Sequence, residues 1–303
     1  MIRLSVIVIF FNMRREASRT LYSLCPQYQQ DIDPEDYEVI AIDNGSTEPL
    51  DPGSVDAFGA NFHYIRHETK SPSPVEAVNL GARVAKADNL LLCVDGARIS
   101  TPGTLALTLS AIDAFAPRPT LIATLAWHLG PDVQDKSMND GYGRDVEDQL
   151  LADIDWRNNG YDLFSISTLA PSSRDGWLLT PAESSLISLP RAHFQSLGGF
   201  DERFQSPGGG LATLDFFKRA LALEELAYVM LLGEGTFHQF HGGVSTNVLP
   251  SPFARFSDEY LAIRGESYSR PSREPVYFGS VPEQCLPFLQ LSVERARNRE
   301  SER

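Results

Sequence analysis

Short apolar runs alternate with amphipathic stretches from residue 4 to about residue 125. Runs rich in aliphatic and β-branched residues predict five strands, over residues 4–10, 37–42, 61–65, 89–94 and 120–125. Two stretches between them have helical periodicity: 14–24, which ends before Pro26, and 75–85, which follows the proline-containing segment 71–74. Such alternation is typical of βαβ units, so the chain predicts an α/β fold with a central, mostly parallel sheet flanked by helices.

The pattern becomes irregular between residues 130 and 180. An acidic amphipathic stretch at 144–155 predicts one helix within it. Long connections are uncommon in compact domains unless they are functional, so these loops are candidates for substrate recognition; a solvated insertion is the alternative. Regular structure resumes with a strand at 184–189, a helix from Arg191 and a helix at 214–223.

The last fifty residues are rich in Pro, Ser and Arg. The last ten predict a frayed helix or a disordered tail, because they are almost entirely polar. The segment 253–288 contains prolines and aromatic residues. It is expected either to fold over a cleft or to serve as a dimer arm.

Composition narrows the classes of partner. The chain has 303 residues, 42% of them hydrophobic, and a formal net charge of −14, which disfavours binding to nucleic acid or to an anionic membrane surface. Three widely separated cysteines, Cys25, Cys93 and Cys285, lack metal-site spacing and predict reduced thiols in a cytoplasmic protein. The apolar run 4–11 is too short to span a bilayer, so no integral membrane segment is expected.

Two aspartates stand where strands are predicted to end. Asp43 is followed by Asn44 and Gly45, and Asp95 ends the apolar run 90–94. Open α/β sheets bind their ligands beyond the carboxyl ends of their strands. Asp43 is therefore a candidate to accept a hydrogen bond from a nucleoside base or ribose, with a turn or helix cap as the alternative.

Several ordered motifs together resemble the family 2 glycosyltransferases, which have the GT-A fold. They are LSVIVIFFN at 4–12, VIAIDNGST at 39–47, AVNLGA at 77–82, the strand that ends at Asp95, and LGGFDERF at 197–204. The resemblance covers roughly residues 4–245. It implies inverting transfer of a sugar from a nucleotide-sugar donor, normally with Mg²⁺ or Mn²⁺. It also implies that Asp43 contacts the nucleotide base and that Phe10, Asn12 and Asn79 lie in segments on the nucleotide side.

The metal motif of that family is altered here. Asp95 matches the first aspartate of the Asp-x-Asp motif, and Ala97 occupies the position of the second. One carboxylate is too few ligands for a cation that bridges phosphates. Arg98 is a candidate to replace part of the cation's charge, because guanidinium pairs with phosphate oxygens; the alternative is a solvent-facing loop residue.

A second source of ligands is the segment TFHQFHGG at 236–243, which is predicted to be a loop. His238 and His241 are both candidates to face the cleft, and histidine is a common ligand of transition metals. The resemblance favours His241, because a histidine at this place completes the metal shell in many family members. A single carboxylate with imidazole favours Mn²⁺ over Mg²⁺. The alternative is a structural pair packed on Phe237 and Phe240.

An inverting transfer also needs a general base on the acceptor side. The family places it in a Glu-Asp pair that corresponds here to Ala212 and Thr213, and neither side chain can act as a base. Asp215 is the nearest carboxylate and is either the base or a helix cap. Glu183 is a second candidate for the base, with a loop salt bridge as its alternative.

These observations together predict a cytoplasmic GT-A glycosyltransferase that moves a sugar from a nucleotide-diphosphate donor to a glycan or small-molecule acceptor. Residues 1–250 form the expected domain, with a nucleotide-binding half at 1–125 and an acceptor-side half at 126–250, and 251–303 form an extension. An oligomer is compatible with the chain. The alternative is a nucleotide- or glycan-binding protein on the same fold that has lost its chemistry. A nucleotidyltransferase is disfavoured, because no Gly-rich basic loop follows the first strand.

Overall fold

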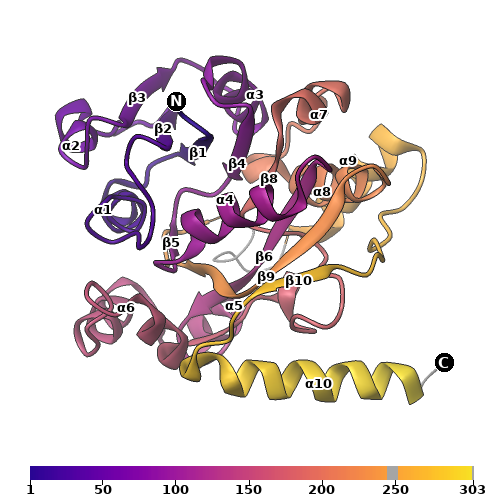
Figure 1. Ribbon diagram of the computed structural model, residues 1–303. Coiled ribbons are helices and arrows are strands. Elements are labelled where there is room, and N and C mark those ends of the chain that lie inside the picture. The colour runs from indigo at the N-terminus through magenta and orange to yellow at the C-terminus, as the bar shows by residue number, and fades with distance from the viewer. Residues whose placement is uncertain (244–251, 302–303) are drawn as a thin grey trace.

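The computed structural model describes residues 1–243 and 252–301, and these form one large mixed sheet covered by helices (Figure 1). The strand order is β10-β9-β6-β8-β4-β1-β2-β3, with β5 paired to β9 and β7 paired to β6. The strands are β1 (Leu4–Phe10), β2 (Tyr37–Asn44), β3 (Phe62–His67), β4 (Asn89–Cys93), β5 (Arg98–Ser100), β6 (Thr120–Leu129), β7 (Ser167–Leu169), β8 (Ile187–Pro190), β9 (Ala227–His238) and β10 (Val276–Gly279).

Ten α-helices and several short 3₁₀ turns connect the strands within the described residues. The helices are α1 (Arg14–Tyr22), α2 (Pro52–Asp56), α3 (Val75–Val84), α4 (Thr104–Phe115), α5 (Gln134–Ser137), α6 (Arg144–Ala152), α7 (Arg191–Ser196), α8 (Ala212–Leu221), α9 (Phe253–Arg264) and α10 (Leu286–Ser301). The 3₁₀ turns are η1 (Met138–Asp140), η2 (Gly160–Ile166), η3 (Pro171–Ser173), η4 (Pro207–Gly209) and η5 (Glu283–Cys285). None of the described helices has the length and apolar composition needed to cross a bilayer.

The expected α/β architecture is confirmed, because five strand pairs are parallel and the sheet is mostly parallel. β1, β2 and β4 are buried almost throughout, as their continuous apolar runs predict. β8 is antiparallel to both β4 and β6, so β4 and β6 run in the same direction. The carboxyl ends of β1, β2, β4, β6 and β9 therefore meet along one edge of the sheet.

Several elements were not predicted from the sequence, and three of them show why. Helix α4 is mostly apolar and packs Leu107, Ala111 and Phe115 on β6 and β9, so its periodicity is weak. Strand β10 is short and half-exposed, and its parallel pairing with β9 defines it. His238 lies at the end of β9, where a loop was predicted, because β9 pairs with β6 as far as this residue.

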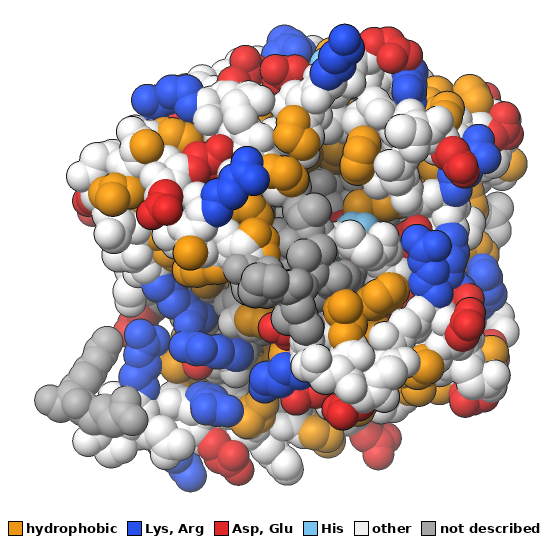
Figure 2. All heavy atoms as spheres, turned by 180° about the vertical axis from the view of Figure 1, so that it is seen from behind, with side chains coloured by type: hydrophobic (Ala, Val, Ile, Leu, Met, Phe, Trp, Pro, Cys, Tyr) orange, Lys and Arg blue, Asp and Glu red, His pale blue; other side chains and the backbone are white. Residues whose placement is uncertain are grey.

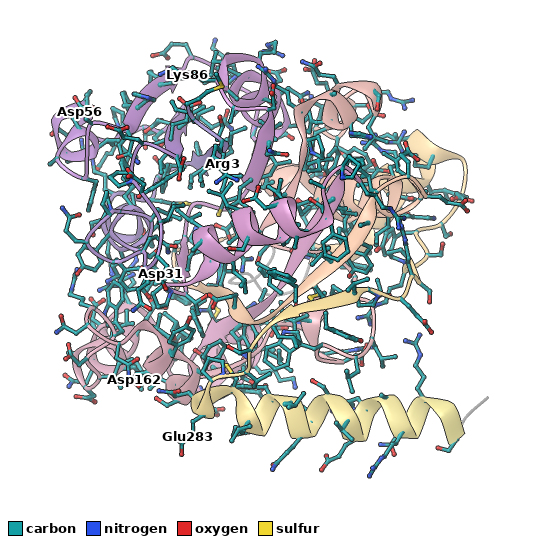
Figure 3. The ribbon with its side chains drawn as sticks, viewed as in Figure 1. Arg3, Asp31, Asp56, Lys86, Asp162 and Glu283 are labelled. Atoms are coloured by element: carbon teal, nitrogen blue, oxygen red, sulfur yellow. The ribbon has the colours of Figure 1, made fainter. Side chains whose placement is uncertain are left out.

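The C-terminal segment is part of the same body. β10 extends the sheet. Gln284 donates a hydrogen bond to Asp162 in η2, and Figure 3 shows Asp162 and Glu283 in the same region of the molecule. A frayed or disordered end was expected over the last ten residues. In the structure α10 includes residues 294–301 of that stretch, and Phe288, Leu289 and Leu291 earlier in the helix pack against the core; residues 302–303 lie outside the described residues.

Candidate active site

A cavity of about 940 Å³ opens at the sheet edge where these strands end. Its walls come from the strand ends near Ile9, Asp95 and His238, from the loop at 170–185, and from α8 and α9. Figure 2 shows the molecule from behind, with a histidine visible near the middle of this face and basic and hydrophobic side chains around it. The cavity is thus built from both halves of the chain and from its C-terminal segment.

The C-terminal segment folds over the cleft, which is the first of the two alternatives considered for 253–288. Phe256 of α9, Tyr268 and Arg270 line the cavity. The irregular segment 130–180 also reaches it, through residues 170–172, Arg144 and Arg174. That segment is therefore part of the cavity wall.

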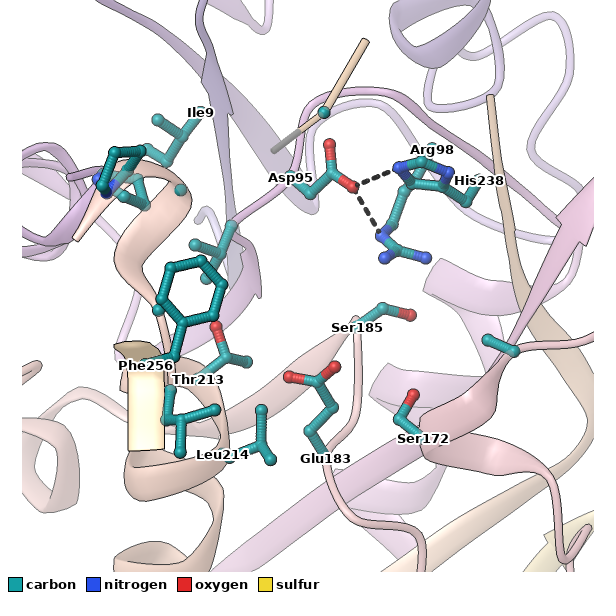
Figure 4. Close-up of a pocket in the computed structure, with 18 of the residues that line it drawn as sticks. Ile9, Asp95, Arg98, Ser172, Glu183, Ser185, Thr213, Leu214, His238 and Phe256 are labelled. Atoms are coloured by element: carbon teal, nitrogen blue, oxygen red, sulfur yellow. Dashed lines mark ion pairs between the residues drawn. The ribbon is translucent and has the colours of Figure 1, made fainter. Parts of the chain in front are cut away.

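Asp95, His238 and His241 converge at one end of the cavity. Their nearest ligand atoms all lie within 4.8 Å of one another, with His238 Nε2 3.0 Å from Asp95 Oδ2 and His241 Nε2 3.7 Å from Asp95 Oδ1 (Figure 4 draws the first contact). Gly96 lets this turn approach β1, because a Cβ there would stand 2.4 Å from the ring of Phe10. The fold therefore brings Asp95 into one cluster with the two histidines, which lie far from it in the sequence.

The electrostatics of this cluster suit a cation. Burial opposes ionisation of Asp95, but His238 and Arg98 outweigh it and hold the pKa of Asp95 well below its usual value. Burial lowers the pKa of His238 to about 4, so its imidazole is neutral at pH 7. A carboxylate and two imidazoles whose nitrogen and oxygen atoms face one another form a donor set for a divalent metal ion.

Arg98 lies beside the cluster with its side chain only 12% exposed. Its Nε is 3.4 Å from Asp95 Oδ2, and its buried Nη1 has no hydrogen-bond partner among the described residues. Arg98 also lines the cavity, so it is not the solvent-facing residue of the alternative interpretation. A guanidinium in this place can bind an anionic oxygen near the cluster.

Glu183 lies across the cavity from this cluster, and its carboxylate points into the open space (Figure 4). Burial, with repulsion from Asp95, raises the pKa of Glu183 to about 7, while Arg98 opposes the shift. No hydrogen bond or ion pair reaches this carboxylate from residues 1–243 or 252–301 as described. It is therefore not the loop salt bridge of the alternative interpretation.

The loop that carries Glu183 is held through its backbone. The hydroxyl of Tyr268 donates to the carbonyl of Ala182 at 2.9 Å, and Arg270 Nε donates to the carbonyl of Thr180 at 3.1 Å. Ser184 Oγ donates to the carbonyl of Thr124 on β6. These contacts fix the loop and leave the Glu183 side chain available to the cavity.

Asp215 does not reach the cavity. It is 2% exposed, and its carboxylate accepts hydrogen bonds from Arg219 Nε at 2.8 Å and from Arg264 Nε and Nη2 at 2.6 and 2.7 Å. Thr213 and Leu214 line the cavity instead. The expectation that Asp215 supplies the base does not fit this arrangement, because two guanidinium groups occupy its oxygens.

Three residues predicted on the nucleotide side have structural partners rather than a place in the cavity. Phe10 is fully buried, while its neighbours Ile9 and Phe11 line the cavity. Asp43 accepts from the backbone of Ser46 and Leu50 and from Arg66, so it holds the turn after β2. Asn79 binds both backbone groups of Phe200 and holds the 198–202 turn.

Asn12 does line the cavity. Its backbone has φ 53°, and its side-chain oxygen accepts from the backbone N–H of Thr47 at 2.9 Å. This contact joins the loop after β1 to the loop after β2. Asn12 therefore shapes the wall of the cavity that is formed by the first two strands.

Two residues at the site had no signal in the sequence. His128 lies one residue before the end of the buried strand β6 and is the register partner of His238. Gln134, fully buried at the start of α5, hydrogen-bonds to both histidines. His128 lies within an apolar run, and Gln134 lies in a segment without periodicity, so only the packing of β6 on β9 identifies them.

Comparisons with known proteins bear on the fold. Residues 5–117 match the family described as Glycosyl transferase family 2. The structure of Staphylococcus aureus TarS 1–349 in complex with UDP-GlcNAc matches with a TM-score of 0.53 and 17% identity over 86% of this chain and 67% of that chain. A longer TarS structure matches with a TM-score of 0.53 and 17% identity over 89% of this chain and 44% of that one. No curated protein sequence matches the chain.

At 17% identity the structural likeness establishes the fold, and the substrate is a separate question. The fold is the GT-A fold that the sequence motifs implied. The family match ends at residue 117, before the cavity walls formed by Glu183, α8 and α9. The chain also spans less than half of the longer TarS chain.

Proposed function

We propose that this chain, whose residues 5–117 match the model of glycosyl transferase family 2, is an inverting glycosyltransferase that moves a sugar from a nucleotide-diphosphate donor to an acceptor hydroxyl. One observation carries the proposal. Among the described residues, only two carboxylates line the cavity: Asp95, which lies in the histidine cluster, and Glu183, which lies outside it. The reaction needs a carboxylate that binds the cation and another that acts as the base, and these two residues can supply them.

The donor diphosphate lies, in this proposal, beside Asp95, His238, His241 and Arg98. A bound divalent cation, Mn²⁺ or Mg²⁺, would neutralise part of the leaving group's charge. Arg98 places a permanent positive charge at the same end of the cavity. The nucleoside lies against the loops after β1 and β2, where Asn12 forms the wall.

Glu183 acts as the general base. It takes the proton of the acceptor hydroxyl as that oxygen forms its bond to the anomeric carbon, while the bond from this carbon to the diphosphate oxygen breaks and the nucleoside diphosphate leaves. A carboxylate with a pKa of about 7 is well matched to this step near neutral pH. In this proposal residues 1–125 form most of the donor side, to which the second half adds His238 and His241, and Glu183 with α9 forms the acceptor side.

The proposal is tested with a panel of nucleotide sugars, with Mn²⁺, Mg²⁺ or EDTA, by measuring release of nucleoside diphosphate with and without glycan acceptors. Release should require the cation, and Asp95→Ala should lower it at least about a hundredfold. Asp56→Asn changes an exposed carboxylate of α2 at the edge of the molecule (Figure 3) and should leave the rate unchanged.

Calorimetric measurement of nucleotide binding distinguishes the enzyme from the alternative, a binding protein without catalytic activity. A chain that binds nucleoside diphosphate with Mn²⁺ yet releases none from any donor is a binding protein, and the replacement of the family's Glu-Asp pair by Ala212 and Thr213 would then mark lost chemistry. Failure to bind any nucleoside diphosphate or nucleotide sugar with the cation present would contradict both functions.

A further inference from the structure

Gln134 connects two histidines on neighbouring strands. His128 of β6 and His238 of β9 are register partners in the parallel pair, and their ring centroids lie 5.2 Å apart. Gln134 is fully buried beside them, at the first turn of α5. A buried amide with a neighbour on each side fixes where protons can be, because each of its groups either donates or accepts.

The side chain of Gln134 determines the tautomer of His238. Its Nε2 donates to the backbone carbonyl of His238 at 3.0 Å, and a carbonyl can only accept, so the orientation of the amide is fixed. The amide oxygen then faces His238 Nδ1 at 2.8 Å, which must carry the proton. His238 Nε2 then faces the cluster, 3.0 Å from Asp95 Oδ2 and 3.2 Å from His241 Nε2, where it donates to Asp95 while it carries a proton and has a lone pair for a cation once that proton is lost.

The backbone of Gln134 determines the opposite tautomer of His128. Its N–H donates to His128 Nδ1 at 3.1 Å, so this nitrogen has no proton and Nε2 of the neutral ring carries it. His128 lines the cavity, and no described residue accepts a hydrogen bond from its Nε2. His128 therefore offers an N–H donor within the cavity, next to the ring whose Nε2 faces the cluster.

We propose that Gln134 is a positioning residue that holds these histidines in opposite tautomers, so that His238 gives a lone pair to a divalent cation and His128 donates to an oxygen of the diphosphate that this cation binds. The inference rests on the proposed function for the identity of the diphosphate. It assigns Gln134 and His128 roles that the family motifs do not contain. An outer hydrogen bond of this kind orients a metal-binding imidazole and raises its basicity.

The first experiment tests whether Gln134 acts through its hydrogen-bond acceptor for His238 or only through the space that its side chain fills. Gln134→Leu removes the acceptor, and Gln134→Glu keeps an oxygen for His238 Nδ1. Affinity for Mn²⁺ alone, measured by electron paramagnetic resonance of the free ion, should fall about 10- to 100-fold in Gln134→Leu and stay within about threefold of the original chain in Gln134→Glu. Equal affinities in both variants, or equal losses, would overturn the assignment, and thermal melting reports whether each variant is folded.

The tautomers themselves are observable without any ligand. Imidazole ¹⁵N spectra of the metal-free protein should show the proton of His238 on Nδ1 and that of His128 on Nε2. Gln134→Leu should shift His238 toward the other tautomer and leave His128 unchanged, because the backbone N–H remains. The same tautomer on both rings would refute the proposal.

The second experiment tests His128 as a donor. With Mn²⁺ present, His128→Phe should weaken binding of UDP or GDP, whichever the chain binds, about tenfold, and His128→Gln, which keeps an N–H donor, should recover most of the loss. Affinity for Mn²⁺ alone should not change in either variant. Unchanged nucleotide affinity in His128→Phe would remove His128 from the site.

These readouts also distinguish the inference from the function it rests on. If the original chain binds neither Mn²⁺ nor a nucleoside diphosphate, the proposed function fails, while the ¹⁵N spectra still decide whether Gln134 sets the tautomers. If both ligands bind but Gln134→Leu alters neither the spectra nor the affinity, the function stands and the inference fails.

Discussion

The loop that carries Glu183 and the start of α8 that carries Asp215 are two regions where the sequence placed a candidate base. In the fold, Glu183 faces the cavity and forms no ion pair with any residue that the structure describes, whereas Asp215 is enclosed by Arg219 and Arg264. The two regions are also held differently. Tyr268 and Arg270 hold the Glu183 loop through its backbone, whereas Arg264 holds the start of α8 through the side-chain carboxylate of Asp215. The comparison shows that a carboxylate is available for chemistry only where other groups hold its loop.

The largest expected effect comes from removing the available carboxylate. Glu183→Gln keeps the size of the side chain but cannot accept the acceptor's proton, so kcat should fall about 10²- to 10⁴-fold while donor affinity changes little. Steady-state transfer and calorimetry with the donor measure the two quantities. The comparison breaks if Glu183→Gln retains full kcat.

Removing the enclosed carboxylate should change stability rather than chemistry. Asp215→Asn leaves Arg219 and Arg264 without their buried anion, and the free energy of unfolding should fall by about 3 kcal/mol, near the low end for a broken buried pair because both guanidiniums are partly exposed. Urea unfolding measures this, and Asp258→Asn, an exposed change on α9, is the control. A large loss of kcat in folded Asp215→Asn would reverse the roles.

The pH dependence of kcat/KM also tests whether Glu183 or Asp215 is the base. Burial raises the pKa of Glu183 to about 7, and a base works only when it is deprotonated. The ratio kcat/KM should therefore rise tenfold per pH unit below about 7 and level off above it. This limb should disappear in Glu183→Gln and persist in Asp215→Asn. A limb that persists unchanged in Glu183→Gln would assign the ionisation to another group.

The smallest expected effect is a partial rescue. Thr213 lines the cavity at the position where the family resemblance places the base, beside the space that Glu183 faces. A carboxylate introduced there by Thr213→Asp in the Glu183→Gln background should recover about tenfold of the lost kcat, as a less well placed base would. Thr213→Asn is the control without a base. Equal rates for the two double variants would show that this wall does not face the acceptor hydroxyl.

The strands of the first half could be predicted from the sequence, but the roles of two of its polar side chains could not. The apolar runs of β1, β2 and β4 are continuous and local, so they predicted the strands and the place of Asp95 at the sheet edge. The role of Asp43 was predicted from its place at a strand end and from the family motif, and that of Asn79 from the motif alone. In the fold, contacts with Arg66 and Phe200 occupy them, and those contacts depend on packing between distant segments.

The sequence by itself determined the α/β class, the family resemblance, and the grouping of Asp95 with His238 and His241, because periodicity and motif order are local properties of the chain. Only the tertiary structure decided that Glu183 is available and Asp215 is not, since Arg264 lies 49 residues from Asp215. It also brought Gln134 against His238, 104 residues away. Hydrogen bonds and ion pairs between such distant residues follow from packing, and they decide which polar groups are left to meet a ligand.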